Sequence, residues 1–270
     1  MELTSKTKIK EVLTNHQIKP LKSLGQNFLI NKNILNRFVD TCELKKQDVV
    51  LEVGPGLGTI TQAIAPKVQK VIAIEKDKNM CLIMKKTLAN LKNIEIINED
   101  VLKYKVNEAH YKLVGNLPFH ITAPLIRRFL ESEKQPKEMV FMIQKEVGQR
   151  ICAKPPNMSI LAVSVQFYAK PQIISHIPKN SFWPQPKVDS TIIKITPIVN
   201  NQTIDADLFF KILKAGFSSP RKQLINNLSK GLKKDKQTVT AWLLKNSIQP
   251  NQRAETLNVS DWIKLTNTIK

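Results

Sequence analysis

The residues best suited to chemistry form one short run, Asn116-Leu117-Pro118-Phe119, which follows an expected strand. The Asn116 side-chain oxygen and the Leu117 carbonyl can both accept hydrogen bonds from an exocyclic amine. A residue before proline is pushed to extended backbone angles, so Pro118 helps to hold the Leu117 carbonyl outward. Phe119 offers a ring on which a base can stack. The four are the predicted catalytic residues for transfer to a base amine, although the tetrapeptide alone also fits a helix-initiating turn with a core phenylalanine.

A glycine cluster predicts a ligand site elsewhere in the sequence. The chain has only 8 glycines, yet Gly54, Gly56 and Gly58 follow one expected strand directly. Missing side chains there let backbone N–H groups approach a ligand. The spacing is not the dinucleotide fingerprint, because the sixth position of GxGxxG is Thr59 and Pro55 has no N–H to offer a pyrophosphate.

Two acids follow the next two expected strands. Glu75 can accept hydrogen bonds from both ribose hydroxyls of an adenosine. Asp100 can accept from an adenine amino group while Val101 packs on the ring. Because the carboxyl ends of parallel strands meet at one sheet edge, these residues predict a nucleoside site beside the glycine turn. Because the glycine turn lacks the full set of N–H groups that bind a pyrophosphate, the site favours S-adenosylmethionine over a nucleotide.

The elements that must position these residues alternate between short apolar runs and longer amphipathic stretches, which is typical of a doubly wound α/β fold. The expected parallel strands are Val49–Val53, Val71–Glu75, Ile94–Asn98, Lys112–Gly115 and Met139–Gln144. Two further β-rich segments, Ser164–Ala169 and Ser190–Thr196, predict an antiparallel pair at one edge. The predicted fold is α/β and Rossmann-like, with a seven-stranded, mostly parallel sheet and one antiparallel edge strand.

The pattern of expected secondary structure changes near residue 200. Beyond it no strand pattern is left, and helices are expected over Asp207–Phe217, Arg221–Leu232, Gln237–Asn246 and Ser260–Ile269. We expect a ligand-binding domain over residues 1–200, with a basic N-terminal arm at 1–20, and a small all-α domain over residues 201–270.

Charge and composition narrow the classes of partner. The chain carries 42 Lys and Arg against 22 Asp and Glu, a formal net charge of +20. The electrostatic field of so large a positive charge attracts polyanions such as nucleic acid, although the lysines can also be solvated surface residues with no partner. No apolar run approaches the ~18 residues of a membrane helix and no signal-peptide pattern is present, so a cytoplasmic protein is expected. The cysteines and histidines lack the spacing of a metal site, and none is predicted.

Five ordered strings between about residues 20 and 230 resemble the ribosomal RNA adenine dimethyltransferases of the small-subunit type. The strings are Gly25–Leu29, Glu52–Gly58, Asn116–Phe119, Gln144–Val147 with Arg150, and Phe182–Ser190. The resemblance implies a class I methyltransferase fold and S-adenosylmethionine-dependent dimethylation, at N6, of two adjacent adenosines in the 3′-terminal hairpin loop of 16S rRNA. The expected partner is a 30S assembly intermediate, and the expected enzyme is a monomer.

Residue by residue, the resemblance carries cofactor contacts onto Asn27, Leu29, Gly54, Glu75, Asp100 and Asn116, and the residues themselves add Gly56 and Val101. It also makes the C-terminal domain RNA-binding, through Phe217, Arg221 and Lys222 together with Arg150. The chain departs from the family where Pro155–Ile160 lacks a Tyr-Gly pair and where Pro220 stands in place of an arginine. His120 is expected to be a surface or helix-start residue.

Two other functions stay open. Methyltransferases of the macrolide-resistance type dimethylate a 23S rRNA adenosine on the same fold, with a similar tetrapeptide that often has isoleucine in place of Leu117. Leu117 and Pro186–Ser190 favour the small-subunit type. A non-catalytic ribosome-assembly factor on the same fold is the second alternative, and the intact run Asn116–Phe119 argues against it.

Overall fold

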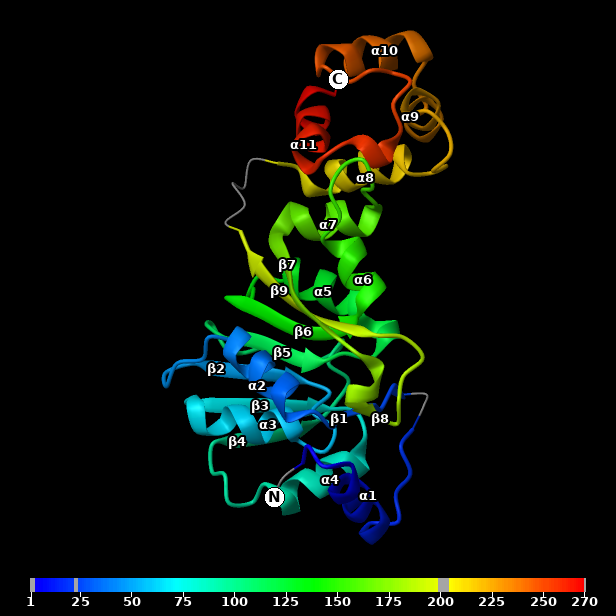
Figure 1. The fold of residues 1–270 in the computed structure, drawn as a ribbon. Coiled ribbons are helices and arrows are strands. Elements are labelled where there is room, and N and C mark those ends of the chain that lie inside the picture. Colours follow the sequence, from blue (N-terminus) through cyan, green and yellow to red (C-terminus); the bar gives the residue numbers. More distant parts are fainter. Residues whose placement is uncertain (1–2, 22–23, 199–203, 270) are drawn as a thin grey trace. The chain divides into compact units, whose positions relative to one another are not determined.

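The computed structural model describes residues 3–21, 24–198 and 204–269, and the chain divides into two compact units (Figure 1). The sheet unit comprises the chain up to Gly148 together with Pro171–Pro197. The helical unit comprises Gln149–Lys170 together with the chain from Ile198 onward. The chain therefore passes between the units three times, and the predicted boundary near residue 200 corresponds only to the last passage.

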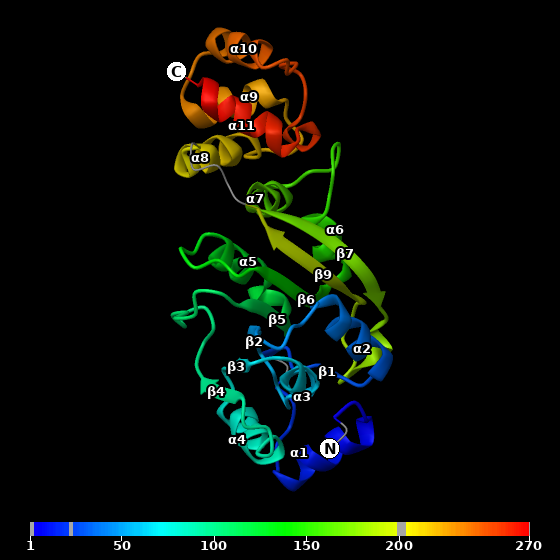
Figure 2. The same ribbon diagram turned by 90° about the vertical axis from the view of Figure 1, so that its left-hand side faces the viewer.

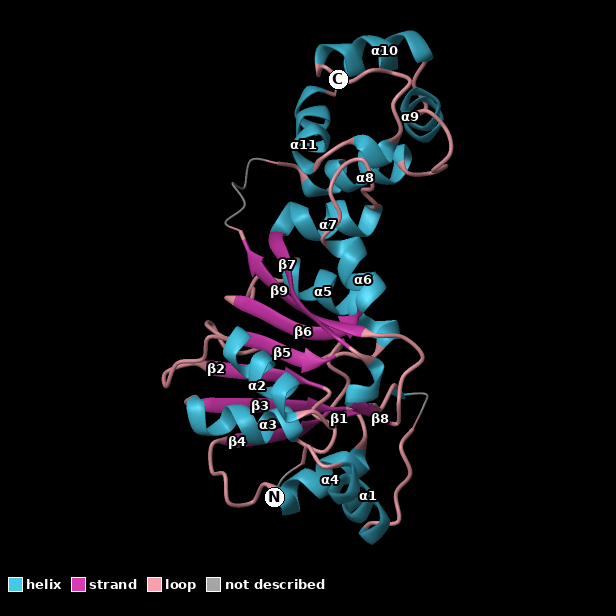
Figure 3. Ribbon diagram, viewed as in Figure 1, coloured by secondary structure: helices cyan, strands magenta, loops and turns pink. Residues whose placement is uncertain are grey.

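The sheet unit is built on a seven-stranded sheet with the order β4-β3-β2-β5-β6-β9-β7 (Figure 3). β2 pairs in parallel with β3 and β5, β3 with β4, and β5 with β6, whereas β9 runs antiparallel to β6. The predicted α/β fold with a mostly parallel sheet of seven strands is confirmed. The strands are β2 (Val49–Val53), β3 (Lys70–Glu75), β4 (Ile94–Asn98), β5 (Lys112–Asn116), β6 (Glu138–Gln144), β7 (Ala169–Ile177) and β9 (Ser190–Pro197).

Helices cover both faces of this sheet. Figure 2 shows α2 (Lys32–Thr41) and α3 (Thr59–Ile64) on one side and α5 (Thr122–Leu130) on the other. Val50 and Leu51, which point to opposite faces of β2, are both completely buried. A central strand of a doubly covered sheet is apolar on both faces, which is why the run Val49–Val53 could be recognised in the sequence.

The N-terminal segment packs against the sheet unit. α1 (Lys6–Asn15) buries an apolar face that includes Ile9 in a cluster with Met80 of α4 (Lys78–Thr87). Further along, β1 (Phe28–Leu29) pairs antiparallel with β8 (Phe182–Trp183). The segment expected as a basic arm thus contains a packed helix, and the residues that follow it are tied to a distant part of the chain.

The C-terminal helices lie close to their predicted positions. They are α8 (Ala206–Gly216), α9 (Leu224–Leu232), α10 (Lys236–Lys245) and α11 (Val259–Thr268), and α6 (Lys145–Ile151) spans the passage between the units. No helix in the described part of the chain is both long and apolar enough to cross a bilayer.

The predicted strand over Ser164–Ala169 is wrong. These residues belong mostly to α7 (Ile160–Tyr168), whose N-cap Ser159 accepts a hydrogen bond from the Ala162 N–H at 3.2 Å. Phe167 of α7 stacks on Phe209 of α8 with ring centroids 4.1 Å apart. α7 shares one apolar core with the C-terminal helices, so it has too little polar surface to show a helical period.

Candidate active site

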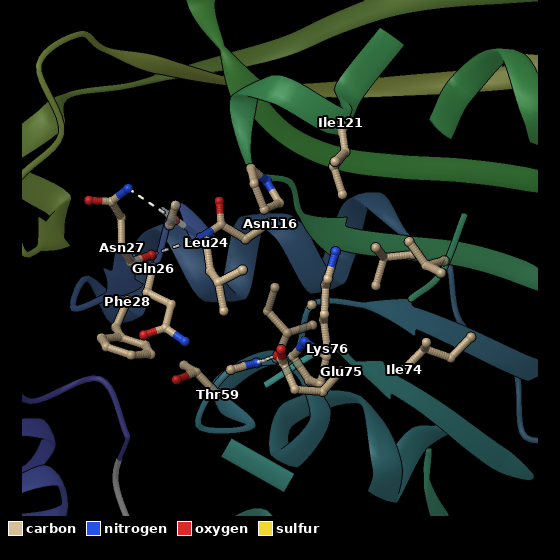
Figure 4. A pocket seen from close by; sticks show the side chains of 18 of the residues that line it. Leu24, Gln26, Asn27, Phe28, Thr59, Ile74, Glu75, Lys76, Asn116 and Ile121 are labelled. Carbon is tan, nitrogen blue, oxygen red and sulfur yellow. Dashed lines mark hydrogen bonds between the residues drawn. The ribbon is translucent and has the colours of Figure 1, made fainter. Parts of the chain in front are cut away.

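One open cavity lies at the carboxyl ends of β2, β3, β4 and β5 (Figure 4). Its volume is about 960 Å³ when the open mouth is counted. The segment 24–29, just before α2, forms one of its walls. The cavity brings together all eight predicted cofactor residues, namely Asn27, Leu29, Gly54, Gly56, Glu75, Asp100, Val101 and Asn116.

The glycine turn after β2 leaves room for a ligand. Gly54, Gly56 and Gly58 all have positive φ angles, at 62°, 59° and 86°, which residues with side chains rarely adopt. A Cβ added to Gly54 would meet no atom within 4 Å, so a ligand can come close to the backbone there. A Cβ at Gly58 would lie 2.7 Å from the end of the Leu88 side chain, so a larger residue there would have to displace that side chain.

Glu75 is held in place by the backbone around it. The Gly56 N–H donates to one carboxylate oxygen at 3.0 Å, and the Asp77 N–H donates to the other at 2.8 Å. Burial raises the pKa of Glu75, whose residue is only 7 % exposed, while these two N–H groups oppose the rise. Each oxygen keeps a further lone pair, so the carboxylate can still accept hydrogen bonds from two hydroxyls.

Asp100 lines the cavity and is ionised more readily than usual. Lys76 Nζ donates to Asp100 Oδ2 at 2.9 Å, and the Leu102 N–H donates to Oδ1 at 3.0 Å. The bond from Lys76 lowers the pKa of Asp100, and the bond from Leu102 adds to it. Next to it, Val101 is buried and lines the cavity. The pair supplies one acceptor and one apolar surface.

Asn116 is anchored by the N-terminal segment. Its Nδ2 donates to the main-chain carbonyl of Asn27 at 2.9 Å. Because a carbonyl only accepts, the amide must turn its nitrogen toward Asn27, which leaves Oδ1 as the atom available to accept. The Leu117 N–H donates to the Met142 carbonyl at 3.0 Å and Pro118 has a ψ of 141°, so the run leaves β5 in an extended conformation.

A second, smaller hollow adjoins the first across the run Asn116–Phe119. Asn116 lines both, whereas Leu117 and Phe119 line the second together with Phe182 and Pro186. The Phe119 ring is 39 % exposed, so the interpretation as a core phenylalanine is wrong. Two recesses that share Asn116 fit a reaction between two bound molecules, with transfer at the point where the recesses meet.

The chain matches one protein family over most of its length. The family model described as ribosomal RNA adenine dimethylase matches residues 16–270. The chain belongs to this family. The match confirms the resemblance drawn from the five sequence strings.

Curated proteins named ribosomal RNA small subunit methyltransferase A are similar to this dimethylase over nearly its whole length. The protein from Alkaliphilus oremlandii is 40 % identical, and the match covers 99 % of this chain and 98 % of that protein. The protein from Bacillus cytotoxicus is 36 % identical over 99 % of this chain and 97 % of its own length.

Solved structures show the same architecture. A dimethyladenosine transferase from Plasmodium falciparum superposes with a TM-score of 0.75 and 27 % identity, over 88 % of this chain and 95 % of that one. The 23S rRNA methyltransferase ErmE also reaches 0.75, over 89 % of this chain and 98 % of its own. Its 23 % identity makes that likeness one of fold alone.

The predicted RNA contacts of the dimethylase lie in the helical unit. Arg221 and Lys222 are exposed in the turn before α9, and Arg150 is exposed on α6. Asn227 of α9 fixes this turn by donating to the Gly216 and Ser219 carbonyls. The Phe217 ring packs near Trp262 with centroids 5.6 Å apart, so that ring contributes to the helical core.

Some residues that line the cavity were not predicted. Gln26 Nε2 donates to Asp77 Oδ2 at 2.8 Å and ties the N-terminal wall to the start of α4. Lys76 lines the mouth beside Asp100. His120, expected as a surface or helix-start residue, is exposed and lines the cavity as well. The position of Lys76 directly after Glu75 is the one sequence signal that could have indicated its place.

A buried carboxyl beneath the glycine turn makes stability depend on pH. Glu52 is 1 % exposed, and its Oε2 has no hydrogen-bond partner among the described residues. Burial raises the pKa of Glu52 to about 8, against 4.5 for an ordinary glutamate. Between those two pH values the unfolded chain has lost a proton that the folded chain keeps, so folding is weakened as the pH rises.

Glu52→Gln should therefore gain stability over the wild type as the pH rises from 4.5 to 8. The gap is expected to widen by up to about 1.4 kcal/mol per pH unit and to stay constant below that range. Urea unfolding at pH 5, 6, 7 and 8 measures it. A gap that does not change with pH would contradict a protonated Glu52.

Proposed function

We propose that this dimethylase transfers methyl groups from S-adenosylmethionine to N6 of two adjacent adenosines in the 3′-terminal hairpin loop of 16S rRNA. We place the reaction on a 30S assembly intermediate in the cytoplasm, with the enzyme as a monomer. The observation that carries the proposal is Asn116, whose fixed amide stands between the two recesses. The small-subunit substrate is supported by the relatives named ribosomal RNA small subunit methyltransferase A.

The residues around the larger cavity fit S-adenosylmethionine. The free space at Gly54 accepts a ligand against the backbone, and Glu75 offers acceptors for the two ribose hydroxyls. Asp100 offers an acceptor for the adenine amine, and Val101 offers a surface for the ring. When bound, the cofactor supplies an electrophilic methyl group.

Asn116 and Leu117 would act on the target amine. The nitrogen lone pair of adenine N6 is delocalised into the ring, and attack needs it turned toward the methyl group. Asn116 Oδ1 and the Leu117 carbonyl accept the two amine hydrogens and so favour a tetrahedral nitrogen. Phe119 stacks on the base and holds it in line. No general base is required, because the product ammonium is acidic and loses its proton to water.

Methylation of isolated particles tests the proposed function. Unmethylated 30S and 50S particles are incubated with the protein and S-adenosylmethionine carrying a labelled methyl group, and the 3′-terminal fragment of 16S rRNA is mapped by mass spectrometry. We expect dimethylation of two adjacent adenosines in 30S alone. Label in 50S alone would favour the macrolide-resistance type, and absence of cofactor binding would favour a non-catalytic assembly factor.

The proposed role of the helical unit is to bind rRNA phosphates through its exposed cations. Replacing both Arg221 and Lys222 by glutamine should weaken binding to 30S particles and lower the slope of log affinity against log salt by about 2. Filter binding between 50 and 300 mM KCl measures the slope, with Lys245→Gln, at the far end of α10, as a single-charge control. An unchanged slope in the double variant would show that Arg221 and Lys222 are solvated surface residues that do not bind phosphates.

A further inference from the structure

The loop that carries Asp100 and Val101 has no helix or strand of its own. It runs over residues 99–111, between β4 and β5. Its first turn is closed from within, since the Lys103 and Tyr104 N–H groups donate to the Asp100 carbonyl at 2.8 and 3.1 Å. These bonds shape the turn but leave its position in the sheet unit to other contacts.

Arg128 of α5 makes such a contact through two nitrogens. Nη1 donates to the Val101 carbonyl, and Nη2 donates to the Tyr104 carbonyl. A guanidinium presents its donors in one rigid plane, so it can fix two acceptors relative to each other. Lysine has a single nitrogen on a flexible stem and lacks this geometry.

Arg128 lies on the helix that follows the run Asn116–Phe119, so its contact links this run to the loop. α5 follows the run Asn116–Phe119 after one short turn. Arg128 is half-buried, with its guanidinium 5.6 Å from the centroid of the Phe129 ring, and it does not line the cavity. The residue therefore joins the loop proposed to recognise adenine to the helix that continues the catalytic run.

We propose that Arg128 is a positioning residue of the cofactor site. It holds Val101 and Asp100 at the distance from β2 and β3 that an adenosine requires, and so sets both the affinity of the site and its preference for adenine. The part of this inference that concerns S-adenosylmethionine rests on the proposed function. The two hydrogen bonds from Arg128 to the loop, which we call the Arg128 clamp, are made by the protein without any ligand.

The adjacent Arg127 provides a matched control. It lies on the same helix, its side chain is 57 % exposed, and it pairs with Glu131 at 2.8 Å. Arg127→Met and Arg128→Met remove the same group from neighbouring positions, whereas Arg128→Lys keeps the charge and loses the fork. All three are compared with the wild type in calorimetric binding of S-adenosylhomocysteine and of S-inosylhomocysteine, in which an oxygen replaces the adenine amine.

Arg128→Met should raise the Kd for S-adenosylhomocysteine about tenfold or more, because two charge-assisted hydrogen bonds are lost. It should also reduce the preference for the adenine over the hypoxanthine compound, which a general loss of stability would not do. Arg128→Lys should lie between Arg128→Met and the wild type, and Arg127→Met should stay within about twofold of the wild type. Equal Kd values and equal preference in the wild type and Arg128→Lys would overturn the proposal, even if Arg128→Met fails to fold.

Hydrogen exchange of the ligand-free protein measures how strongly Arg128 restrains the loop, independently of cofactor binding. Amides of residues 99–111 should exchange faster in Arg128→Lys than in the wild type and Arg127→Met, and unchanged exchange would overturn the clamp. If the wild type binds neither compound while the loop exchanges faster in the variant, the proposed function fails and the clamp stands.

Discussion

Asn116→Ala is expected to slow methyl transfer about a hundredfold or more while the Kd for S-adenosylmethionine stays within severalfold of the wild type. The variant removes Oδ1, the acceptor that the Asn27 carbonyl leaves free by binding Nδ2. An interaction made mainly with the reacting amine lowers turnover and not cofactor binding. Single-turnover methylation of 30S particles and equilibrium binding of the cofactor separate the two effects.

Asn116→Asp serves as the companion variant. It keeps an acceptor oxygen, but it places a carboxylate oxygen next to the Asn27 carbonyl, to which Nδ2 donates in the wild type. The repulsion should displace the side chain and again cost most of the turnover. Comparable losses of turnover and of cofactor affinity in Asn116→Ala would show that the residue is mainly a cofactor ligand.

Glu75→Ala should raise the Kd for S-adenosylmethionine about a hundredfold, with a smaller effect on turnover at saturating cofactor. The variant removes the acceptor proposed for two ribose hydroxyls, and hydrogen bonds to a charged group are each worth about 1.5–3 kcal/mol. It also leaves the Gly56 and Asp77 N–H groups without their acceptor. Isothermal titration calorimetry measures the loss.

The raised pKa of Glu75 adds a pH dependence. Protonation turns one acceptor oxygen into a donor, and burial makes it occur at a higher pH than for an ordinary glutamate. Cofactor affinity of the wild type should therefore fall as the pH is lowered, and that of Glu75→Ala should fall less. Glu95→Ala, an exposed position on β4 that pairs with Lys70, is the control. Equal pH profiles in the wild type and Glu75→Ala would contradict this role of the carboxylate.

The strands around the site could be predicted because each is a short run that contains Val, Ile or Leu side chains, and because β3, β4 and β5 end at the polar residues Glu75, Asn98 and Asn116. β2 and β4 match their predicted limits, and β3, β5 and β6 differ by one residue. Once these strands are parallel neighbours, their carboxyl ends must meet, so Glu75, Asp100 and Asn116 had to line one cavity. Local sequence and one topological rule were sufficient for this part of the site.

Contacts made across long stretches of sequence were not predictable. The bond from Asn116 to the Asn27 carbonyl joins residues 89 positions apart and depends on a main-chain oxygen, which no residue type reveals. Arg128 reaches two other main-chain oxygens in the same way. α7 was missed for a related reason, because its apolar surface is covered by α8 and α11, which lie beyond residue 205 in the chain.

The three passages of the chain between the units bear on how such a protein can diversify by gene recombination. A single exchange near residue 198 would set foreign C-terminal helices against the resident α7, whose Phe167 stacks on Phe209. A single exchange near residue 148 would import β7 and β9 as well, and with them two of the seven strands. The helical unit can therefore be inherited without any strand of the sheet only through several coordinated exchanges, so its two segments are expected to evolve together.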